Sequence, residues 1–309
     1  MSLGPVRLEP SFHERVWGAK VLGPWYPDAK KPTGEVWFPS GDLLVKFIFT
    51  ADRLSVQVHP DDDYAMRVEG SPGKTEMWYV LRAEPGAEIA TGFRQSVTRE
   101  QVREAALSGE IEDMLQWWPV QAGDVFFIPA GTVHAIGGGL VLCEIQQNSD
   151  LTYRLYDYGR PRPLHLDKAL DVATLGPHPG PSRAAGAGRL AECPYFTADL
   201  RVVTAPEDYT AESGSLLIVL DGCGSLATQP VQTGQVWLTP PGALPARLCP
   251  TGWLLLLEIF PPSSGSASSA PLAVSLLSVS RYPARRPAPA APRKRGRSTP
   301  SSRRKPADH

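Results

Sequence analysis

Short apolar runs, broken by Gly and Pro, recur along most of this chain. The runs are rich in branched and aromatic residues, and most end in Gly, Pro or Asp, which is typical of β-strands. Many short strands separated by tight turns favour antiparallel barrels or sandwiches. The predicted strands are residues 43–50, 52–59, 76–83, 124–130 and 139–146, followed by 213–228, 234–242 and 253–260.

One segment has helical rather than strand periodicity. Within residues 98–118, Val102 and Ala105 lie on one apolar stripe. Thr98, followed three residues later by Gln101, has the pattern of a capping box. The sequence therefore predicts a small helical insertion between strands, where it could flank or cover a site.

Stretches rich in Pro, Gly, Ala and Ser divide the chain. We expect a larger unit over residues 1–175, a linker over 176–190 and a smaller barrel over 191–262. Residues 263–309 are predicted to be a second linker and a disordered basic tail. From residue 281 onward there is almost no apolar side chain to bury.

The net charge of −1 hides an asymmetry along the chain. From residue 281 onward ten Lys or Arg accompany one acidic residue, so this tail carries +9 and the remainder carries about −10. Such a tail could engage nucleic acid or an anionic membrane, although we favour a passive, solvated extension. No apolar run reaches the roughly 18 residues that span a bilayer, and no signal pattern opens the chain. We therefore expect a cytoplasmic protein.

A polar pair stands in the second predicted strand. Residues two apart on a strand face the same way, so Gln57 and His59 project together while Val56 and Val58 face the other side. The pair could point into a barrel or out to solvent, and taken alone it favours the surface. Glu76 likewise begins an apolar strand, where a buried carboxylate would need a partner.

A turn motif near residue 130 is more specific. Gly123, Pro129, Gly131 and His134 are spaced as in the second conserved motif of cupins, a family of small β-barrels. The Gly and Pro residues form a tight turn, which would deliver His134 into the barrel interior. Gly138 stands where cupins usually carry Asn, so the resemblance covers the turn and the ligand.

Four side chains from three strands together form a candidate metal site. Two imidazoles and two oxygen donors suit a catalytic divalent metal with a position left for water or substrate. Only Glu76 is charged, so a dication would keep about +1, which favours Lewis-acid action on a sugar oxygen. The second unit has no His between residues 192 and 262, so we expect a metal-free structural barrel. The four candidate ligands are Gln57, His59, Glu76 and His134.

Several longer motifs follow one another in the first unit. They are ERVWG (14–18), LLVKFIFTADRLSVQVHPDD (43–62), GKTEMWYVL (73–81), IPAGTVHAI (128–136) and SDLTYRLYDYGR (149–160). In these motifs the chain resembles the type I mannose-6-phosphate isomerases, in their short bacterial form, which belong to the cupin superfamily. The resemblance covers roughly residues 5–165 and, more weakly, the second barrel.

The resemblance implies a fold, an activity and a set of site residues. The fold would be mainly β, with two cupin-type jelly-roll barrels and a small helical insertion in the first. The protein would be a monomer that holds one zinc ion per chain and interconverts mannose 6-phosphate and fructose 6-phosphate. Arg154 and Lys74 match residues of the family's active site, and Gly73 replaces a His of the longer enzymes. The implied zinc ligands are Gln57, His59, Glu76 and His134.

Aldose–ketose isomerisation moves a proton between C1 and C2 through an enediol, which requires a base and positive charge near the developing oxyanion. Arg154 can hold an enediolate oxygen or a phosphate. Lys74 is either a phosphate clamp or a proton shuttle. Glu144, alone in an apolar strand, is a candidate base or a member of a structural ion pair. Asp157 and Arg160 are expected to form a local ion pair.

Three other functions stay open at this point. An iron-dependent dioxygenase would use mainly His ligands with one carboxylate. Another sugar-phosphate isomerase would share the metal chemistry. A non-catalytic sugar-phosphate binding cupin would typically lack a ligand or Arg154, and the sequence retains them all.

Overall fold

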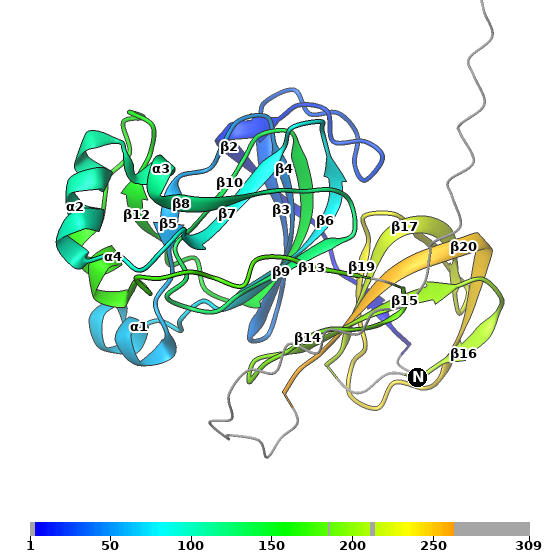
Figure 1. Ribbon diagram of the computed structural model, residues 1–309. Coiled ribbons are helices and arrows are strands. Elements are labelled where there is room, and N and C mark those ends of the chain that lie inside the picture. The colour runs from blue at the N-terminus through cyan, green and yellow to red at the C-terminus, as the bar shows by residue number, and fades with distance from the viewer. Residues whose placement is uncertain (1–3, 185, 211–213, 263–309) are drawn as a thin grey trace, which may run out of the picture.

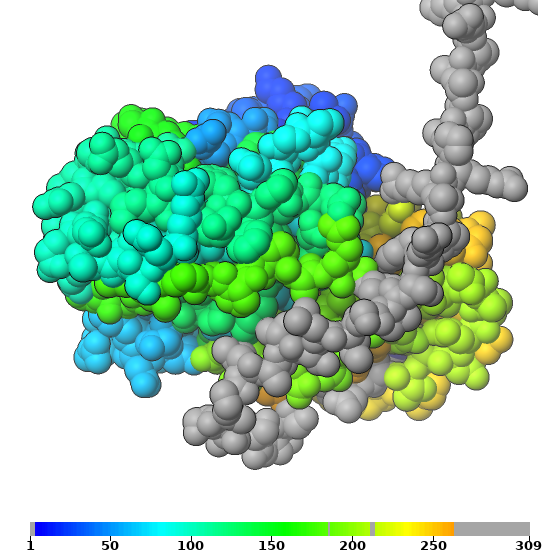
Figure 2. All heavy atoms as spheres, in the orientation of Figure 1, coloured from blue at the N-terminus to red at the C-terminus, as the bar shows by residue number. Residues whose placement is uncertain are grey.

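A computed structural model describes residues 4–184, 186–210 and 214–262 of the chain. The predictions for the tail over 263–309 lie outside the described residues. Within the described part the fold is mainly β, as predicted, with two unequal β units and four helices. In Figures 1 and 2 the larger unit runs from blue to green and the smaller unit from yellow-green to orange, and in Figure 1 the blue N-terminal segment also lies against the smaller unit.

Two sheets face each other in the first unit. The strands are β2 (Ser11–Ala19), β3 (Thr33–Ser40), β4 (Leu43–Thr50), β5 (Val56–Val58), β6 (Glu76–Ala83), β7 (Glu88–Phe93), β8 (Leu115–Pro119), β9 (Asp124–Ile128), β10 (His134–Ile136), β11 (Leu140–Gln147), β12 (Tyr153–Tyr156) and β13 (Ser182–Arg183). The seven-stranded sheet has the order β13-β9-β6-β11-β4-β2-β3, and the five-stranded sheet has the order β12-β5-β10-β7-β8.

The second unit contains one strongly curved sheet around a small core of its own. Its strands are β1 (Val6–Arg7), β14 (Gly188–Glu192), β15 (Thr197–Val203), β16 (Glu207–Tyr209), β17 (Leu216–Leu226), β18 (Gln229–Gln232), β19 (Val236–Leu238) and β20 (Ala246–Phe260). The order is β1-β19-β17-β20-β15-β14, with β16 beside β20 and β18 beside β17. The N-terminal strand β1 thus pairs within the second unit.

The helices are α1 (Asp62–Glu69), α2 (Arg99–Ser108), α3 (Ile111–Met114) and α4 (Leu166–Val172). The capping box of Thr98 and Gln101 is confirmed. The predicted helical segment was too long, because Gly109 ends α2 in a left-handed conformation and residues 115–119 pair with β7 as a strand. No helix in the described ranges is long and apolar enough to cross a membrane.

The helical insertion does not cover the site. The buried residues of α2 and α4 pack on the outer face of the five-stranded sheet, against Val56 and Val58 of β5. Both valines are fully buried there, as the strand pattern predicted. The layers therefore run from helices through the five-stranded sheet and the seven-stranded sheet to the second unit (Figure 1).

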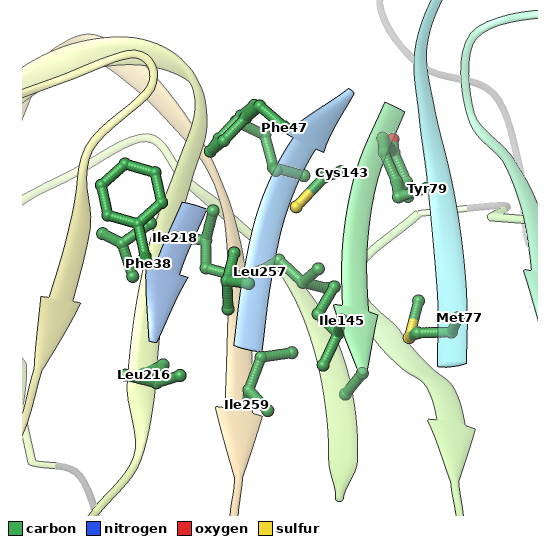
Figure 3. Close-up of a cluster of buried hydrophobic side chains, with 14 of the residues drawn as sticks. Phe38, Phe47, Met77, Tyr79, Cys143, Ile145, Leu216, Ile218, Leu257 and Ile259 are labelled. Carbon is green, nitrogen blue, oxygen red and sulfur yellow. The ribbon is translucent and has the colours of Figure 1, made fainter. Parts of the chain in front are cut away.

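The central strands β4, β6 and β11 of the seven-stranded sheet are buried on both faces. On β4, Phe47 and Phe49 face the second unit, whereas Lys46 and Ile48 face the barrel interior. The outward face packs on the second unit's sheet, and Figure 3 shows side chains of both sheets in one buried layer, among them Phe47, Ile218 and Leu257. Strands buried on both faces read as nearly continuous apolar runs, which explains the sequence of β4. The contacting residues include Phe47, Cys143 and Ile145 on one side and Leu216, Ile218 and Leu257 on the other.

We retain as a proposal the division into units at 1–175 and 191–262 with a linker at 176–190. β13 adds to the first unit, and β14 begins the second unit's hairpin. Because the two units share one buried apolar cluster, they should unfold as a single cooperative body.

Ile218→Ala tests the shared core. Ile218 is fully buried between the units, so its truncation should lower the free energy of unfolding by about 2–5 kcal/mol, measured by urea titration. The half-exposed Val202→Ala is the control and should cost less than about 1 kcal/mol. Separate unfolding of the second unit, ahead of the first, would contradict a shared core.

Candidate active site and metal centre

Three of the predicted ligands meet inside the first barrel. His59 follows β5, Glu76 begins β6 and His134 begins β10. Their ligand atoms all lie within 4.8 Å of one another. Oε1 of Glu76 lies 3.6 Å from Nε2 of each imidazole. Tetrahedral ligands placed about 2.1 Å from a zinc ion lie about 3.4 Å apart, so this spacing fits one metal ion.

The turn that carries His134 is bonded to the strand end that carries His59. Gly131 has a φ of +88°, a conformation that glycine adopts without strain. Its N–H donates to the carbonyl of His59 at 2.8 Å. The turn motif thus fixes both imidazoles with one main-chain contact.

Main-chain carbonyls orient both imidazoles. Nδ1 of His59 lies 2.7 Å from the carbonyl of Leu151, and Nδ1 of His134 lies 2.9 Å from that of Thr132. A carbonyl only accepts, so each Nδ1 carries the proton and each Nε2 presents a lone pair. Burial lowers the pKa of His59 well below its usual value and that of His134 to about 4. Both rings are therefore neutral near pH 7.

One of these lone pairs, on Nε2 of His134, faces the Gln57 amide nitrogen at 3.2 Å, whereas Nε2 of His59 has no donor among the described residues. Oε1 of Glu76 is likewise buried without a hydrogen-bond partner in the described part of the chain. Burial raises the pKa of Glu76 to about 7, although Lys74 lies 2.9 Å from its other oxygen. Buried acceptors that converge without a donor are costly. A bound cation removes that cost, so the residues fit a metal ion.

Gln57 lies beside this cluster. It is opposite His134 in the pairing of β5 with β10, and its amide nitrogen lies 3.2 Å from Nε2 of that ring. Its amide oxygen accepts a hydrogen bond from the Ser55 hydroxyl at 3.0 Å. Turning the amide over would aim the oxygen at the three ligands, and the hydroxyl could then accept instead.

A cavity of about 350 Å³ lies beside the candidate ligand cluster, since Gln57, which lies 3.2 Å from His134, and Lys74, which lies 2.9 Å from Glu76, both line it. Gln57, Lys74 and Glu144 line this cavity, together with further Lys and Arg side chains. Arg154 lines it too, and its guanidinium has no carboxylate within 4.0 Å in the described part of the chain. Its Nε is buried without a partner, and burial lowers its pKa, yet a guanidinium stays charged. Arg154 is thus available to an anionic ligand.

Lys74 and Glu144 belong to a buried chain of charges. Lys74 lies 4.0 Å from Glu144, and Glu144 lies 3.1 Å from Lys46. Burial alone would lower the pKa of Lys74, but Glu76 and Glu144 outweigh it and raise that pKa. Burial alone would raise the pKa of Glu144, but Lys46 and Lys74 hold it below its ordinary value. Lys74 is therefore a cation and Glu144 is an ionised carboxylate.

The sequence reasoning missed Lys46, which is 2% exposed and lines the cavity. Lys46 is the one charged residue in the apolar run of β4. Glu144 was chosen as a candidate for the same reason, as a lone charge in the apolar run of β11. Arg15 and Arg162 also line the cavity, but each is paired, with Glu35 at 2.5 Å and with Asp157 at 2.6 Å.

The expected local ion pair near residue 157 is confirmed. Arg160 lies 3.3 Å from the Asp157 carboxylate and also contacts Asp52 at 2.6 Å. These contacts tie the segment after β12 to the loop before β5. They hold the strand that carries Arg154 beside the strand that carries Gln57.

Comparison with known proteins identifies the family. No protein-family model matches the chain. A mannose-6-phosphate isomerase of Streptococcus mutans is 36% identical over 217 residues, which cover 56% of this chain and 68% of that protein. The mannose-6-phosphate isomerase ManA of Bacillus subtilis is 32% identical over 302 residues, which cover 78% of this chain and 95% of that protein.

Solved structures agree with the sequence relatives. The crystal structure of the mannose 6-phosphate isomerase from Bacillus subtilis superposes with a TM-score of 0.73 at 26% identity, covering 84% of this chain and 100% of that chain. A putative mannosephosphate isomerase from Archaeoglobus fulgidus shares the fold, with a TM-score of 0.73 at 18% identity and coverage of 84% and 99%. The cupin-type fold expected from the motifs is thus confirmed. The chain belongs to the mannose-6-phosphate isomerase family of enzymes.

Proposed function

We propose that this protein is a zinc-dependent aldose–ketose isomerase that interconverts mannose 6-phosphate and fructose 6-phosphate through an enediol. The observation that carries the proposal is the convergence of Nε2 of His59, Nε2 of His134 and Oε1 of Glu76 beside a cavity that is lined by Arg154, a guanidinium with no carboxylate partner in the described part of the chain. Such a cavity suits a ligand with a reacting oxygen and an anionic group. Family membership supplies the substrate.

His59, Glu76 and His134 would hold the zinc ion, with Gln57 as a fourth ligand once its amide oxygen faces the site. Zinc would supply positive charge to the substrate oxygen that becomes enolate-like. The Nδ1 hydrogen bonds of both imidazoles keep their tautomers fixed for this role. We expect one zinc ion per chain and a small-molecule sugar phosphate as the substrate.

The proton transfer between C1 and C2 requires a base in the same cavity. Glu144 is ionised and borders the cavity, which supports a role as base. Its contacts with Lys46 and Trp78 equally suit a structural ion pair, so both roles are retained. Lys74, held in its charged form, would neutralise a developing oxyanion or contact the phosphate.

Arg154 would receive the remaining anionic group. A guanidinium offers a planar fork of donors that matches a phosphate or an enediolate. Arg15 and Arg162 border the same cavity, but each is already paired with a carboxylate. Arg154 is therefore the member of this group that is free to bind substrate.

A coupled assay of mannose 6-phosphate conversion, run with and without a chelator, tests the proposal. We expect turnover that the chelator abolishes and that added zinc restores. Oxygen uptake with iron, and no isomerisation with zinc, would instead indicate a dioxygenase. Tight binding of the sugar phosphate without turnover would indicate a binding protein.

His134→Ala tests the metal centre. Removing an imidazole from the convergent set should lower zinc affinity by more than about 100-fold and abolish isomerisation, measured by metal analysis and the coupled assay. His59→Ala should behave in the same way. His178→Gln is the matched control, since His178 bonds to the carbonyl of Phe127 outside the cluster. Retention of full zinc content by either Ala variant would contradict the ligand assignment.

Arg154→Ala separates substrate binding from metal binding. Zinc content should stay at one ion per chain, whereas kcat/KM should fall by about 100-fold or more, because the variant loses a charged contact to the transition state. Arg103→Ala, which breaks only an exposed pair with Asp167, should leave both values unchanged. Normal turnover of the Arg154 variant would remove that residue from the mechanism.

A further inference from the structure

A hydrogen-bonded chain connects the second unit to the segment that carries Lys74. Tyr195 lies in the turn between β14 and β15, and its ring packs against the apolar cluster shared by the two units. Its hydroxyl donates to Oδ2 of Asp62 at 2.8 Å. Asp62 is the first residue of α1, in the first unit.

Asp62 in turn holds one side of the Lys74 segment. Its Oδ1 accepts from the N–H of Gly73 at 2.8 Å and from Nε2 of Gln147 at 2.9 Å. The amide oxygen of Gln147 accepts from the N–H of Thr75 at 2.8 Å. The peptide N–H groups on both sides of Lys74 are therefore fixed by a network that ends at Tyr195.

The packing of this segment leaves little room for movement. Gly73 is pressed against the start of α1, where an added Cβ would lie 2.4 Å from the carbonyl carbon of Asp61. The N–H of Lys74 donates to the carbonyl of Pro60 at 2.9 Å. The ammonium group of Lys74 lies 2.9 Å from Glu76 and 4.0 Å from Glu144. Its position between these two carboxylates depends on where the main chain of residues 73–75 holds the lysine.

We infer that Tyr195 of the second unit is a positioning residue for Lys74. Its hydroxyl fixes the Asp62 carboxylate, which fixes the segment 73–75 and so the depth of the lysine in the cavity. The second barrel thereby contributes to the reaction without contacting substrate. The inference rests on the proposed function, in which Lys74 contacts the reacting sugar phosphate.

Tyr195→Phe in the full-length, zinc-loaded protein tests the inference. The variant keeps the ring in the shared core and removes only the hydroxyl. We expect kcat/KM to fall about tenfold with zinc content unchanged, because small displacements of a reacting group cost large factors in rate. Tyr26→Phe is the matched control, since its hydroxyl also crosses between the units, to the carbonyl of Gly234 at 2.7 Å, but leads to no site residue.

The control variant should lose comparable thermal stability and less than twofold in kcat/KM. In a Lys74→Met background, Tyr195→Phe should cost less than a further twofold, since the hydroxyl acts through that lysine. Equal losses of turnover in the two Tyr variants, or an undiminished tenfold loss in the Lys74→Met background, would overturn the inference alone. Absence of turnover in the unmodified protein would instead reject the proposed function, and this inference with it.

Discussion

The site depends on a sheet whose central strands are buried on both faces. β4, β6 and β11 present apolar side chains to the second unit and a mixture of apolar and charged side chains to the barrel interior. A charge on such a strand cannot reach solvent, so it must find a partner inside. Lys46 therefore pairs with Glu144, and Lys74 pairs with Glu76. The second unit excludes water from the outer face of the seven-stranded sheet. These charged side chains are therefore gathered on the inner side of that sheet.

The two buried glutamates differ in how they are satisfied. Glu144 contacts Lys46 and accepts a hydrogen bond from Trp78 at 2.9 Å, and its pKa is held low. Glu76 has Lys74 on one oxygen, but its other oxygen faces only two imidazole lone pairs, and its pKa is raised. The unsatisfied carboxylate is the one that needs a cation. This difference supports the proposal of Glu76 as a metal ligand, whereas Glu144 stays a candidate base or a member of a structural ion pair.

Regular β patterns were predictable, and contacts between distant segments were not. Residues 43–50 were predicted with the bounds of β4, because a strand buried on both faces reads as one apolar run. The helices α1 and α4 were not predicted, since their eight and seven residues give little periodicity. Residues 115–118 were assigned to a helix, but with residue 119 they form β8, which pairs with β7.

The candidate site shows the same division. Gln57 and His59 could be grouped because residues two apart on a strand face the same way. His134 could be placed in the barrel because it follows the Gly and Pro turn motif. Lys46 was overlooked because a lysine on a strand can extend its ammonium group to solvent, whereas here it is 2% exposed. The contact of Tyr195 with Asp62 joins residues 133 positions apart and leaves no local signature.

The pairing of the buried charges determines how much net positive charge a bound metal ion would bring to the cavity. Counting Glu76 as the sole charged ligand leaves about +1 on a bound dication, but Lys74 already pairs with that carboxylate. The four buried charges of Lys46, Glu144, Lys74 and Glu76 sum to zero, so a dication keeps its charge of +2. Arg154 adds one positive charge to the lining of the cavity, and Asp150 adds one negative charge. Because these two charges offset each other, the isomerisation proposed above would rely on the dication for the positive charge that stabilises an enediolate oxygen.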